Sequence, residues 1–375
     1  MKKTKFFVLL IIFLSACIQT NEKGSFNIED DVVNNEEYER TDVADENTEI
    51  VQASEINEYN CDITPREREF DVATYYEGSL IDDHLHMPSL FSVPEQFKAV
   101  LPWNVPVLEK DVAIDEIICL MDKEGITQAI GFYPILQSLA KPSIATIKRI
   151  EERHPNRIIA FLQPAPISMP IFEPEVLDEV MTSNQDVFKG YGELGTYLGV
   201  FQGTNPDDPK FLESYRIAGK HKLIVMIHPM PYNIDAVERA IKQNPNVTFL
   251  LHGDEAEVQM MSVIENNDNA YYSLDAALFP KSVYYFKSKE EFVDHFKKNF
   301  YNDLNESIAE WKPRIESNPD KIMWGTDRLE KWHFDDEVSG IIEEFSRSFI
   351  GSLDPRVQEK FAYKNAERML EDVKK

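Results

Sequence analysis

Two histidines lie two residues apart in the stretch Ile81-Asp82-Asp83-His84-Leu85-His86, directly after a short apolar run. On a β-strand, residues i and i+2 point to the same side, so the imidazoles of His84 and His86 can face one point. Neutral imidazole binds Zn, Fe, Ni and Cu, which makes that point a candidate metal site. A pair of this kind is common by itself, so its meaning depends on the rest of the chain.

Four more side chains that can bind a metal each follow an apolar, strand-like run: Glu193, His228, His252 and Asp327. If these runs are parallel strands of one barrel, all four residues lie at the carboxyl ends of strands, where barrel active sites are built. A divalent ion held there lowers the pKa of a bound water from about 15.7 to about 7. A neighbouring carboxylate can then take the proton of that water and return it to a leaving group.

The elements that would position these residues alternate along the chain after about residue 62. Apolar runs typical of buried parallel strands cover 80–81, 129–133, 158–162, 188–192, 223–227, 247–251, 270–274 and 321–325. Helical patterns lie between most of them, at 115–123, 143–153, 174–181, 208–220, 234–242 and 258–265. Eight such units predict an α/β fold, a (β/α)8 TIM barrel formed as a single domain by residues 61–375. A doubly wound open sheet is the structural alternative.

The motifs as a set resemble the amidohydrolase superfamily. The His84-Leu85-His86 pair is similar to its ligands on the first strand, and Trp324-Gly325-Thr326-Asp327 is similar to its last-strand motif. The segment 361–370, with the sequence FAYKNAERML, resembles the closing helix of the amidohydrolase-related (amidohydrolase 2) branch. The resemblance covers essentially the whole chain after residue 60. It implies that His84, His86, His228 and Asp327 bind a metal, and that Asp327 also shuttles a proton.

The resemblance leaves the number of metal ions open. His252 matches a histidine that either binds a second metal or polarises the substrate carbonyl. Glu193, in Gly192-Glu193-Leu194-Gly195, resembles the glutamate that bridges two metals in the TatD-type branch, whereas other branches have a modified lysine or no ligand there. Zinc is the expected ion, and a site of histidine and carboxylate also accommodates Mn, Fe or Ni.

The leading functional hypothesis is a metal-dependent hydrolase acting on an amide, ester or lactone of a small organic substrate. A non-oxidative, metal-dependent decarboxylase is the alternative, because the amidohydrolase-related branch includes such enzymes. A TatD-like phosphodiesterase and an inactive surface-tethered binding protein are weaker alternatives. The formal net charge of −27 leaves no evident phosphate-binding footprint, which disfavours nucleic acid as a partner. The oligomeric state stays open, a homo-oligomer included.

Two long insertions follow candidate strands and would emerge at the active end of the barrel. Residues 87–111 carry Trp103, and residues 276–297 carry Lys281, a conceivable partner for an anionic substrate group. Such insertions serve as lids or pocket walls, or are ordinary surface loops. His333 follows the last strand, where it either contacts substrate or helps to start a helix.

The N-terminus is typical of an exported lipoprotein. Lys2, Lys3 and Lys5 precede an apolar run at 6–14 that is short for a membrane span. Leu14-Ser15-Ala16-Cys17 resembles a lipoprotein signal box, which implies removal of residues 1–16 and lipid attachment to Cys17. An uncleaved anchor helix is the alternative. Residues 17–60 are acidic and poor in large apolar side chains, which predicts a disordered tether. The protein is therefore expected outside the cytoplasm, lipid-anchored at the cell envelope.

Cys61 and Cys119 are the cysteines outside the signal region. They could pair in an oxidising compartment, but two cysteines do not make a disulfide framework. We expect both to be free, with Cys119 as a core residue.

Overall fold

The structure is a computed structural model, and it describes residues 61–64, 66–91, 105–165, 172–195, 204–253, 257–274 and 286–372. All of them fall within one compact unit, Ala44–Lys375. The predicted signal peptide, Cys17 and the tether lie outside the described residues, as do Trp103 and Lys281.

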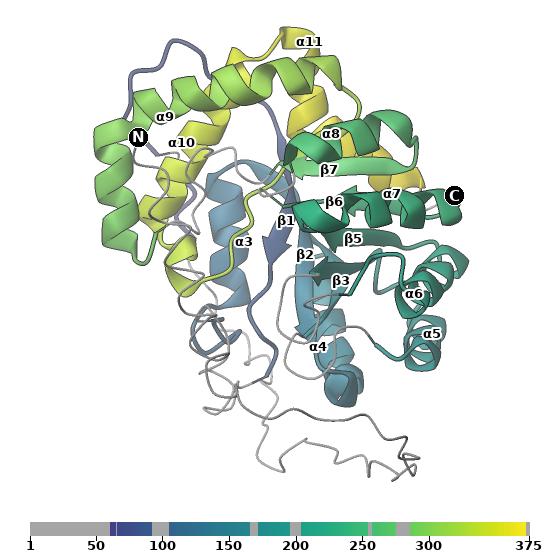
Figure 1. Ribbon diagram of the computed structural model, residues 1–375. Coiled ribbons are helices and arrows are strands. Elements are labelled where there is room, and N and C mark those ends of the chain that lie inside the picture. The colour runs from purple at the N-terminus through teal and green to yellow at the C-terminus, as the bar shows by residue number, and fades with distance from the viewer. Residues whose placement is uncertain are drawn as a thin grey trace, which may run out of the picture. The chain divides into compact units, whose positions relative to one another are not determined.

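Eight parallel strands form one sheet in chain order, as the sequence predicted. They are β1 (Leu80–His86), β2 (Ile126–Ile135), β3 (Ile158–Pro164), β4 (Gly190–Gly195), β5 (Ile224–His228), β6 (Thr248–Leu251), β7 (Ala270–Leu274) and β8 (Ile322–Trp324). A parallel bridge between Leu85 and Arg328 joins the chain beyond β8 to β1. Helices alternate with the strands around this nearly closed barrel (Figure 1). The predicted (β/α)8 barrel is therefore confirmed.

The six predicted helices are present with ends shifted by a few residues. They are α3 (Ile114–Lys123), α4 (Ala140–Arg153), α5 (Pro174–Ser183), α6 (Pro209–Lys220), α7 (Ile234–Gln243) and α8 (Glu257–Asn266). Their apolar stripes explain their placement. In α7, for example, Ile234, Val237 and Ile241 recur at helical spacing and are buried.

Two long helices lie outside the six predicted helical ranges. Helix α9 (Lys289–Ser317) follows β7, and α10 (Asp336–Ser352) follows β8. The expectation of a loop over 276–297 is wrong from Lys289 onward. The missed signal was the spacing of Phe292, Phe296 and Phe300, four residues apart, which places their rings on one helix face. Two of these rings pack on Phe345 of α10, with centroids 5.7 and 5.3 Å away.

The last helix closes the amino-terminal end of the barrel. Helices α11 (Pro355–Glu359) and α12 (Asn365–Asp372) are joined by one π-helical turn, η7 (Lys360–Lys364). Met369 and Leu370 of α12 pack inside the barrel, in one cluster with Ile81 and Tyr271, each the second residue of its strand. The amide of Asn365 donates to the carbonyls of Pro319 (3.0 Å) and Ile322 (2.9 Å), which fixes α12 to the start of β8.

Residues 66–79, here called the N-terminal strap, run across α9 and α10 before β1 begins. The ring of Phe70 stacks on Phe300 with centroids 3.7 Å apart. The carboxylate of Glu344 accepts the backbone N–H groups of Glu69 (2.8 Å) and Phe70 (2.7 Å). Arg347 donates to the carbonyls of Tyr76 and Gly78, so α10 holds the strap by both apolar and polar contacts.

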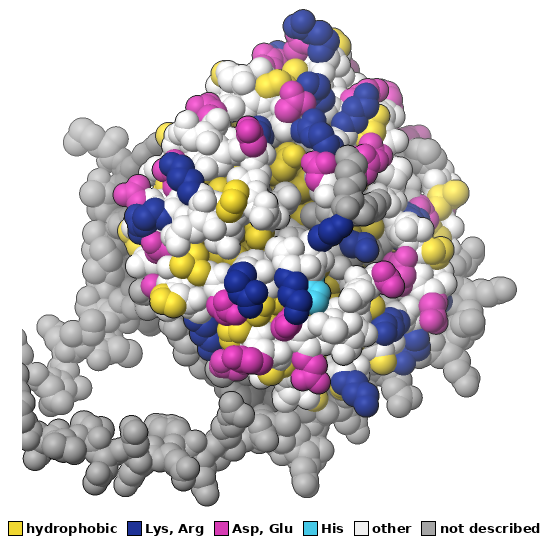
Figure 2. Space-filling model, turned by 90° about the vertical axis from the view of Figure 1, so that its right-hand side faces the viewer, with side chains coloured by type: hydrophobic (Ala, Val, Ile, Leu, Met, Phe, Trp, Pro, Cys, Tyr) yellow, Lys and Arg dark blue, Asp and Glu magenta, His cyan; other side chains and the backbone are white. Residues whose placement is uncertain are grey.

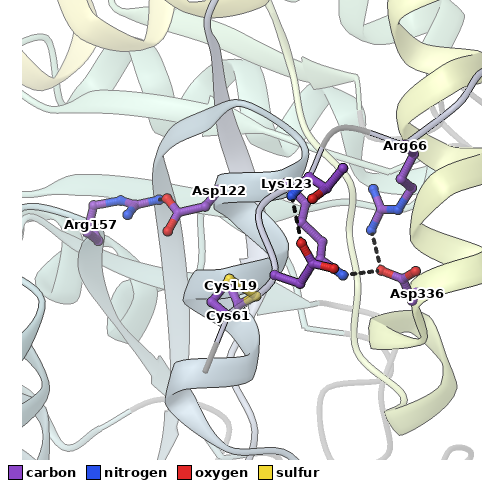
Figure 3. The surroundings of a disulfide bond; sticks show 9 residues. Cys61, Arg66, Cys119, Asp122, Lys123, Arg157 and Asp336 are labelled. Atoms are coloured by element: carbon purple, nitrogen blue, oxygen red, sulfur yellow. Dashed lines mark hydrogen bonds and ion pairs between the residues drawn. A yellow bond between two sulfur atoms is a disulfide. The ribbon is translucent and has the colours of Figure 1, made fainter. Parts of the chain in front are cut away.

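A disulfide joins Cys61 to Cys119 in α3 (Figure 3). The expectation that both cysteines are free is therefore wrong, although Cys119 is buried as expected. The sequence could not reveal the pairing, because it depends on where the chain before the strap lies relative to α3. Beside the disulfide, Lys123 of α3 and Arg66 of the strap both reach Asp336 of α10.

The surface in Figure 2 carries acidic and basic side chains that are interspersed rather than gathered by sign. Within the described ranges, no helix combines the length and the apolar character needed to cross a bilayer.

Breaking the disulfide should destabilise the protein without unfolding it. The bond closes a loop across a sequence separation of 58, and constraining the unfolded chain in this way contributes about 2–4 kcal/mol. We expect Cys61→Ser with Cys119→Ser to lower the free energy of unfolding by about that amount, measured by urea titration. Two titratable thiols in the native wild-type domain would contradict the pairing.

Candidate metal centre

The two histidines of β1 meet Asp327 at the carboxyl end of the barrel. The Asp327 Oδ1 atom lies 3.0 Å from His86 Nε2 and 3.6 Å from His84 Nε2. The two imidazole rings are 4.8 Å apart between centroids, so they face one point as the i, i+2 spacing predicted. The fully buried His84 and the nearly buried His86 and Asp327 form a group whose ligand atoms all lie within 4.8 Å of one another.

A second group of the same kind joins β4, β5 and β6. The Glu193 Oε1 atom lies 2.6 Å from His228 Nδ1 and 3.7 Å from His252 Nε2. The rings of His228 and His252 are edge to face, with centroids 4.4 Å apart. Their ligand atoms also fall within 4.8 Å of one another.

The two groups are adjacent. The rings of His84 and His252 are 4.4 Å apart, and His252 Nε2 lies 3.8 Å from Asp327 Oδ2. Glu193 spans the groups, because its Oε2 atom lies 3.5 Å from His86 while its Oε1 atom contacts His228. Three N or O ligands in each group leave coordination positions for water and substrate, as catalytic metal sites require. Imidazole with carboxylate fits a divalent transition metal.

The electrostatics of the centre keep its carboxylate charged. Burial by itself would raise the pKa of Glu193, but the hydrogen bond from His228 and the charges of His228, His252 and His86 lower it well below its usual range. Glu193 is thus an anion at neutral pH, the form in which a carboxylate binds a cation.

Special backbone positions hold the ligands in place. Gly253 follows His252 with φ +124°, and a Cβ atom there would lie 2.7 Å from the His228 ring, so a side chain would displace that ligand. Gly192, which precedes Glu193, has φ +129°, and its Cβ would lie 2.4 Å from the Met226 carbonyl. Asp327 itself has φ 51°, a left-handed conformation that aspartate tolerates at a cost.

Asp82 joins the first and last strands below the ligands. Its Oδ1 atom accepts the backbone N–H groups of Thr326 (2.9 Å) and His84 (3.1 Å), and its Oδ2 atom accepts the Thr326 hydroxyl (2.6 Å). The Asp327 N–H donates to the His84 carbonyl at 2.8 Å. Complete burial raises the pKa of Asp82 to about 6, against hydrogen bonds from Thr326 that favour the anion. Asp82 therefore orients both ligand segments.

Gln163 reaches the centre without having been predicted, and Asp83 is buried beside His84 in β1. Gln163 is the penultimate residue of β3, and its Oε1 atom lies 3.4 Å from His86 Nδ1 while its Nε2 atom lies 3.5 Å from Glu193 Oε2. Asp83 is fully buried and accepts the Ser273 hydroxyl at 2.6 Å. The position of Gln163 at a strand end was the available signal, since every strand of a barrel delivers its last residues to the same end.

His333 lies in the short helix η6 (Lys331–Phe334), where its ring bonds to the backbone. It is 1 % exposed, and its Nδ1 atom accepts the backbone N–H groups of Leu329 (3.0 Å) and Glu330 (3.2 Å). This geometry fits the helix-start alternative. Trp103 and Lys281 fall outside the described residues, so their predicted contacts with substrate stay predictions.

Several solved structures share this fold at low sequence identity. A candidate 2-pyrone-4,6-dicarboxylic acid hydrolase from Pseudomonas putida has a TM-score of 0.53 at 12% identity, covering 78% of this chain and 98% of its own. One from Acinetobacter baumannii, with citric acid bound, has a TM-score of 0.52 at 12% identity and covers 78% and 100%. An amidohydrolase from Burkholderia multivorans has a TM-score of 0.50 at 12% identity and covers 78% and 99%. No protein-family model and no curated protein matches the chain.

The buried His333 should make stability depend on pH. Burial, with the charges of Arg328 and His86, lowers the pKa of His333 to about 3. Between about pH 6.5 and that value the unfolded chain binds the extra proton, so stability falls as pH falls. Between about pH 7 and about pH 5, the free energy of unfolding of wild type should fall by about 2 kcal/mol more than that of His333→Asn, because asparagine cannot take up the proton. Urea unfolding of both chelator-treated proteins at the two pH values measures the difference. Parallel losses in the two proteins would show that His333 titrates normally.

Proposed function

We propose that this protein is a metal-dependent hydrolase of the amidohydrolase type, acting on an amide, ester or lactone of a small organic molecule. The observation that carries the proposal is the pair of adjacent ligand groups at the carboxyl end of a (β/α)8 barrel. Support for the family also comes from the shared fold of the solved hydrolases and from the motifs of the first and last strands.

The residues of the centre divide the chemistry among them. A divalent ion bound there would supply a water nucleophile at neutral pH and polarise the scissile carbonyl. His84, His86 and Asp327 would hold one ion, and His228 and His252 a second, with Glu193 between them. Asp327 accepts the proton of the attacking water on its carboxylate and returns it to the leaving group.

Two ions are favoured over one by the place of Glu193. Its two oxygens face the two ligand groups, at 2.6 Å from His228 and 3.5 Å from His86. A one-ion decarboxylase would leave this glutamate without a ligand role, so its position favours hydrolysis over the decarboxylase alternative. A site of imidazole and carboxylate accommodates Zn, Mn, Fe or Ni, and we propose zinc as the first ion to test.

Removing the β1 histidines should prevent metal binding at the group that contains Asp327. We expect His84→Ala with His86→Ala to abolish turnover on a panel of lactones, esters and amides that includes 2-pyrone-4,6-dicarboxylate. The same variant should bind fewer metal ions per chain, measured by plasma emission spectrometry of purified protein. Wild type should hold two ions.

The matched control removes two histidines elsewhere. His154 and His221 pair with Asp115 and Asp178 at helix ends, away from both ligand groups. The variant His154→Ala with His221→Ala should retain metal and activity. Full activity in the His84/His86 variant would contradict the proposal. Release of carbon dioxide from a substrate by the wild-type protein would favour the decarboxylase alternative instead.

We further propose that the protein is exported and held at the cell envelope by lipid on Cys17. The motif Leu14-Ser15-Ala16-Cys17 supports this, and the Cys61–Cys119 disulfide supports an oxidising compartment. An acidic domain at such a surface suits a small diffusing substrate better than nucleic acid.

Cys17→Ser should release the protein from membranes. We expect the wild type expressed in bacteria to incorporate radiolabelled palmitate and the variant to incorporate none, because the sulfur is the acylation site. Cys61→Ser with Cys119→Ser is the control that keeps the label. A Cys17→Ser variant that stays in the membrane fraction would instead indicate the uncleaved anchor helix.

A further inference from the structure

A buried ion pair lies directly behind the ligand Asp327. Arg328, the next residue, donates from both terminal nitrogens to Glu124, with Nη1–Oε2 at 3.0 Å and Nη2–Oε1 at 2.9 Å. Each side chain is 2 % exposed. Removing two charges from water costs several kcal/mol per ion, so a pair of this kind is weak evidence for stability alone. Another role has to explain its position.

The backbone of Arg328 is tied to the ligands on both sides. Its carbonyl accepts the N–H of His86 at 3.0 Å, and it forms the parallel bridge to Leu85. Asp327, which precedes it, is held at φ 51°. The backbone of Arg328 is therefore bonded to the ligand His86 at the end of β1 and directly follows the ligand Asp327 beyond β8.

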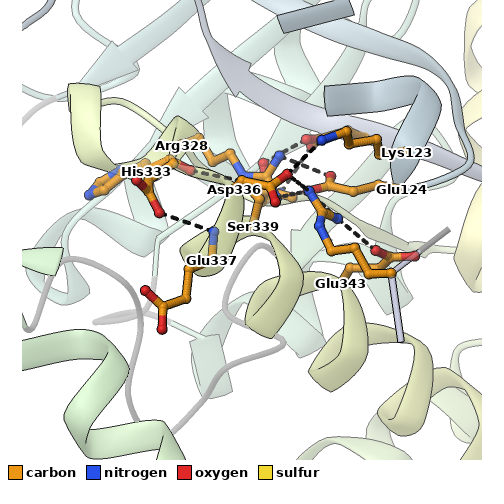
Figure 4. Close-up of polar contacts among 12 residues, drawn as sticks. Lys123, Glu124, Arg328, His333, Asp336, Glu337, Ser339 and Glu343 are labelled. Atoms are coloured by element: carbon orange, nitrogen blue, oxygen red, sulfur yellow. Dashed lines mark hydrogen bonds and ion pairs between the residues drawn. The ribbon is translucent and has the colours of Figure 1, made fainter. Parts of the chain in front are cut away.

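Glu124 is anchored in turn, so it can serve as a fixed support. It is the C-cap residue of α3, and its carbonyl accepts Arg347 Nη2 at 2.5 Å. Arg66 of the N-terminal strap lies 3.9 Å from its carboxylate and also pairs with Glu343 at 2.9 Å. Figure 4 shows Arg328 and Glu124 within this group of charges, with Lys123, Asp336 and Glu343 around them.

We infer that Arg328 is a positioning residue for the metal centre, and that the bidentate Glu124–Arg328 pair fixes the geometry of His86 and Asp327. The inference rests on the proposed function and assigns a role in metal binding to Arg328 and Glu124, which lie outside both ligand groups. The planar guanidinium supplies two parallel bonds, which define a direction that a single point charge cannot define. Loss of such supporting contacts costs about 10–100-fold in metal affinity.

The test separates positioning from stability. Arg328→Met alone leaves the Glu124 carboxylate buried without its partner and should lower the melting temperature. That result would follow whether or not Arg328 positions the ligands. Arg328→Met with Glu124→Leu removes both charges and should recover most of that loss, because apolar replacement of a buried pair is often neutral. We expect this double variant, stripped with chelator, to bind Zn²⁺ about 10–100-fold more weakly than wild type by titration calorimetry.

The matched control is the pair between Asp122 of α3 and Arg157, at 2.8 Å, which touches neither ligand segment. Asp122→Leu with Arg157→Met should leave Zn²⁺ affinity within about twofold of wild type. Wild-type affinity in the Glu124/Arg328 double variant would overturn the inference and leave the proposed function standing. If that variant does not fold, Arg328→Lys provides the test, because lysine keeps the positive charge but cannot form the two parallel hydrogen bonds of the guanidinium. A Zn²⁺ affinity equal to that of wild type in Arg328→Lys would then overturn the inference. A wild type that binds no Zn²⁺, Mn²⁺ or Fe²⁺ would overturn both.

Discussion

The seam between the first and last strands is the contact on which the rest of the structure depends. Strand β8 has three residues, and beyond it the chain joins β1 through hydrogen bonds of Asp82, Thr326 and Asp327 and through the Leu85–Arg328 bridge. A barrel removes sheet edges only when its first and last strands pair. Here the residues that close the barrel are the ligands or their immediate neighbours, so one set of bonds completes both the fold and the site.

The centre gathers charge of both signs in a small buried space. Four imidazoles surround two carboxylates, and His228 bonds one of them at 2.6 Å. The hydrogen bond from His228 and the charges of the surrounding imidazoles lower the pKa of Glu193 against the effect of burial. A divalent ion would bind these imidazoles in their neutral form and would be balanced by the two carboxylates.

The sequence predicted the barrel, its eight strands and the six residues that converge, because each depends on local pattern: apolar runs, helical spacing and residues at strand ends. What it missed depends on contacts distant in sequence. The Cys61–Cys119 bond depends on where the chain before the strap lies relative to α3, and Glu124 meets Arg328 from the C-cap of α3. The predicted insertion over 276–297 overlaps the first residues of helix α9, in which Phe292, Phe296 and Phe300 recur at helical spacing.

The closing helix has a consequence for how the molecule is made. Met369 and Leu370 of α12 share one core with Ile81, near the start of β1, and Asn365 holds the beginning of β8. That core cannot be assembled before α12 itself has been synthesised and can pack. Contacts of such high sequence separation form slowly, because the cost of closing the long loop precedes any gain from packing. A chain cut short before residue 365 would leave the interior of its barrel open to water, and quality-control proteases recognise exposed apolar surface of this kind. The barrel interior is therefore filled only after α12 has packed into it.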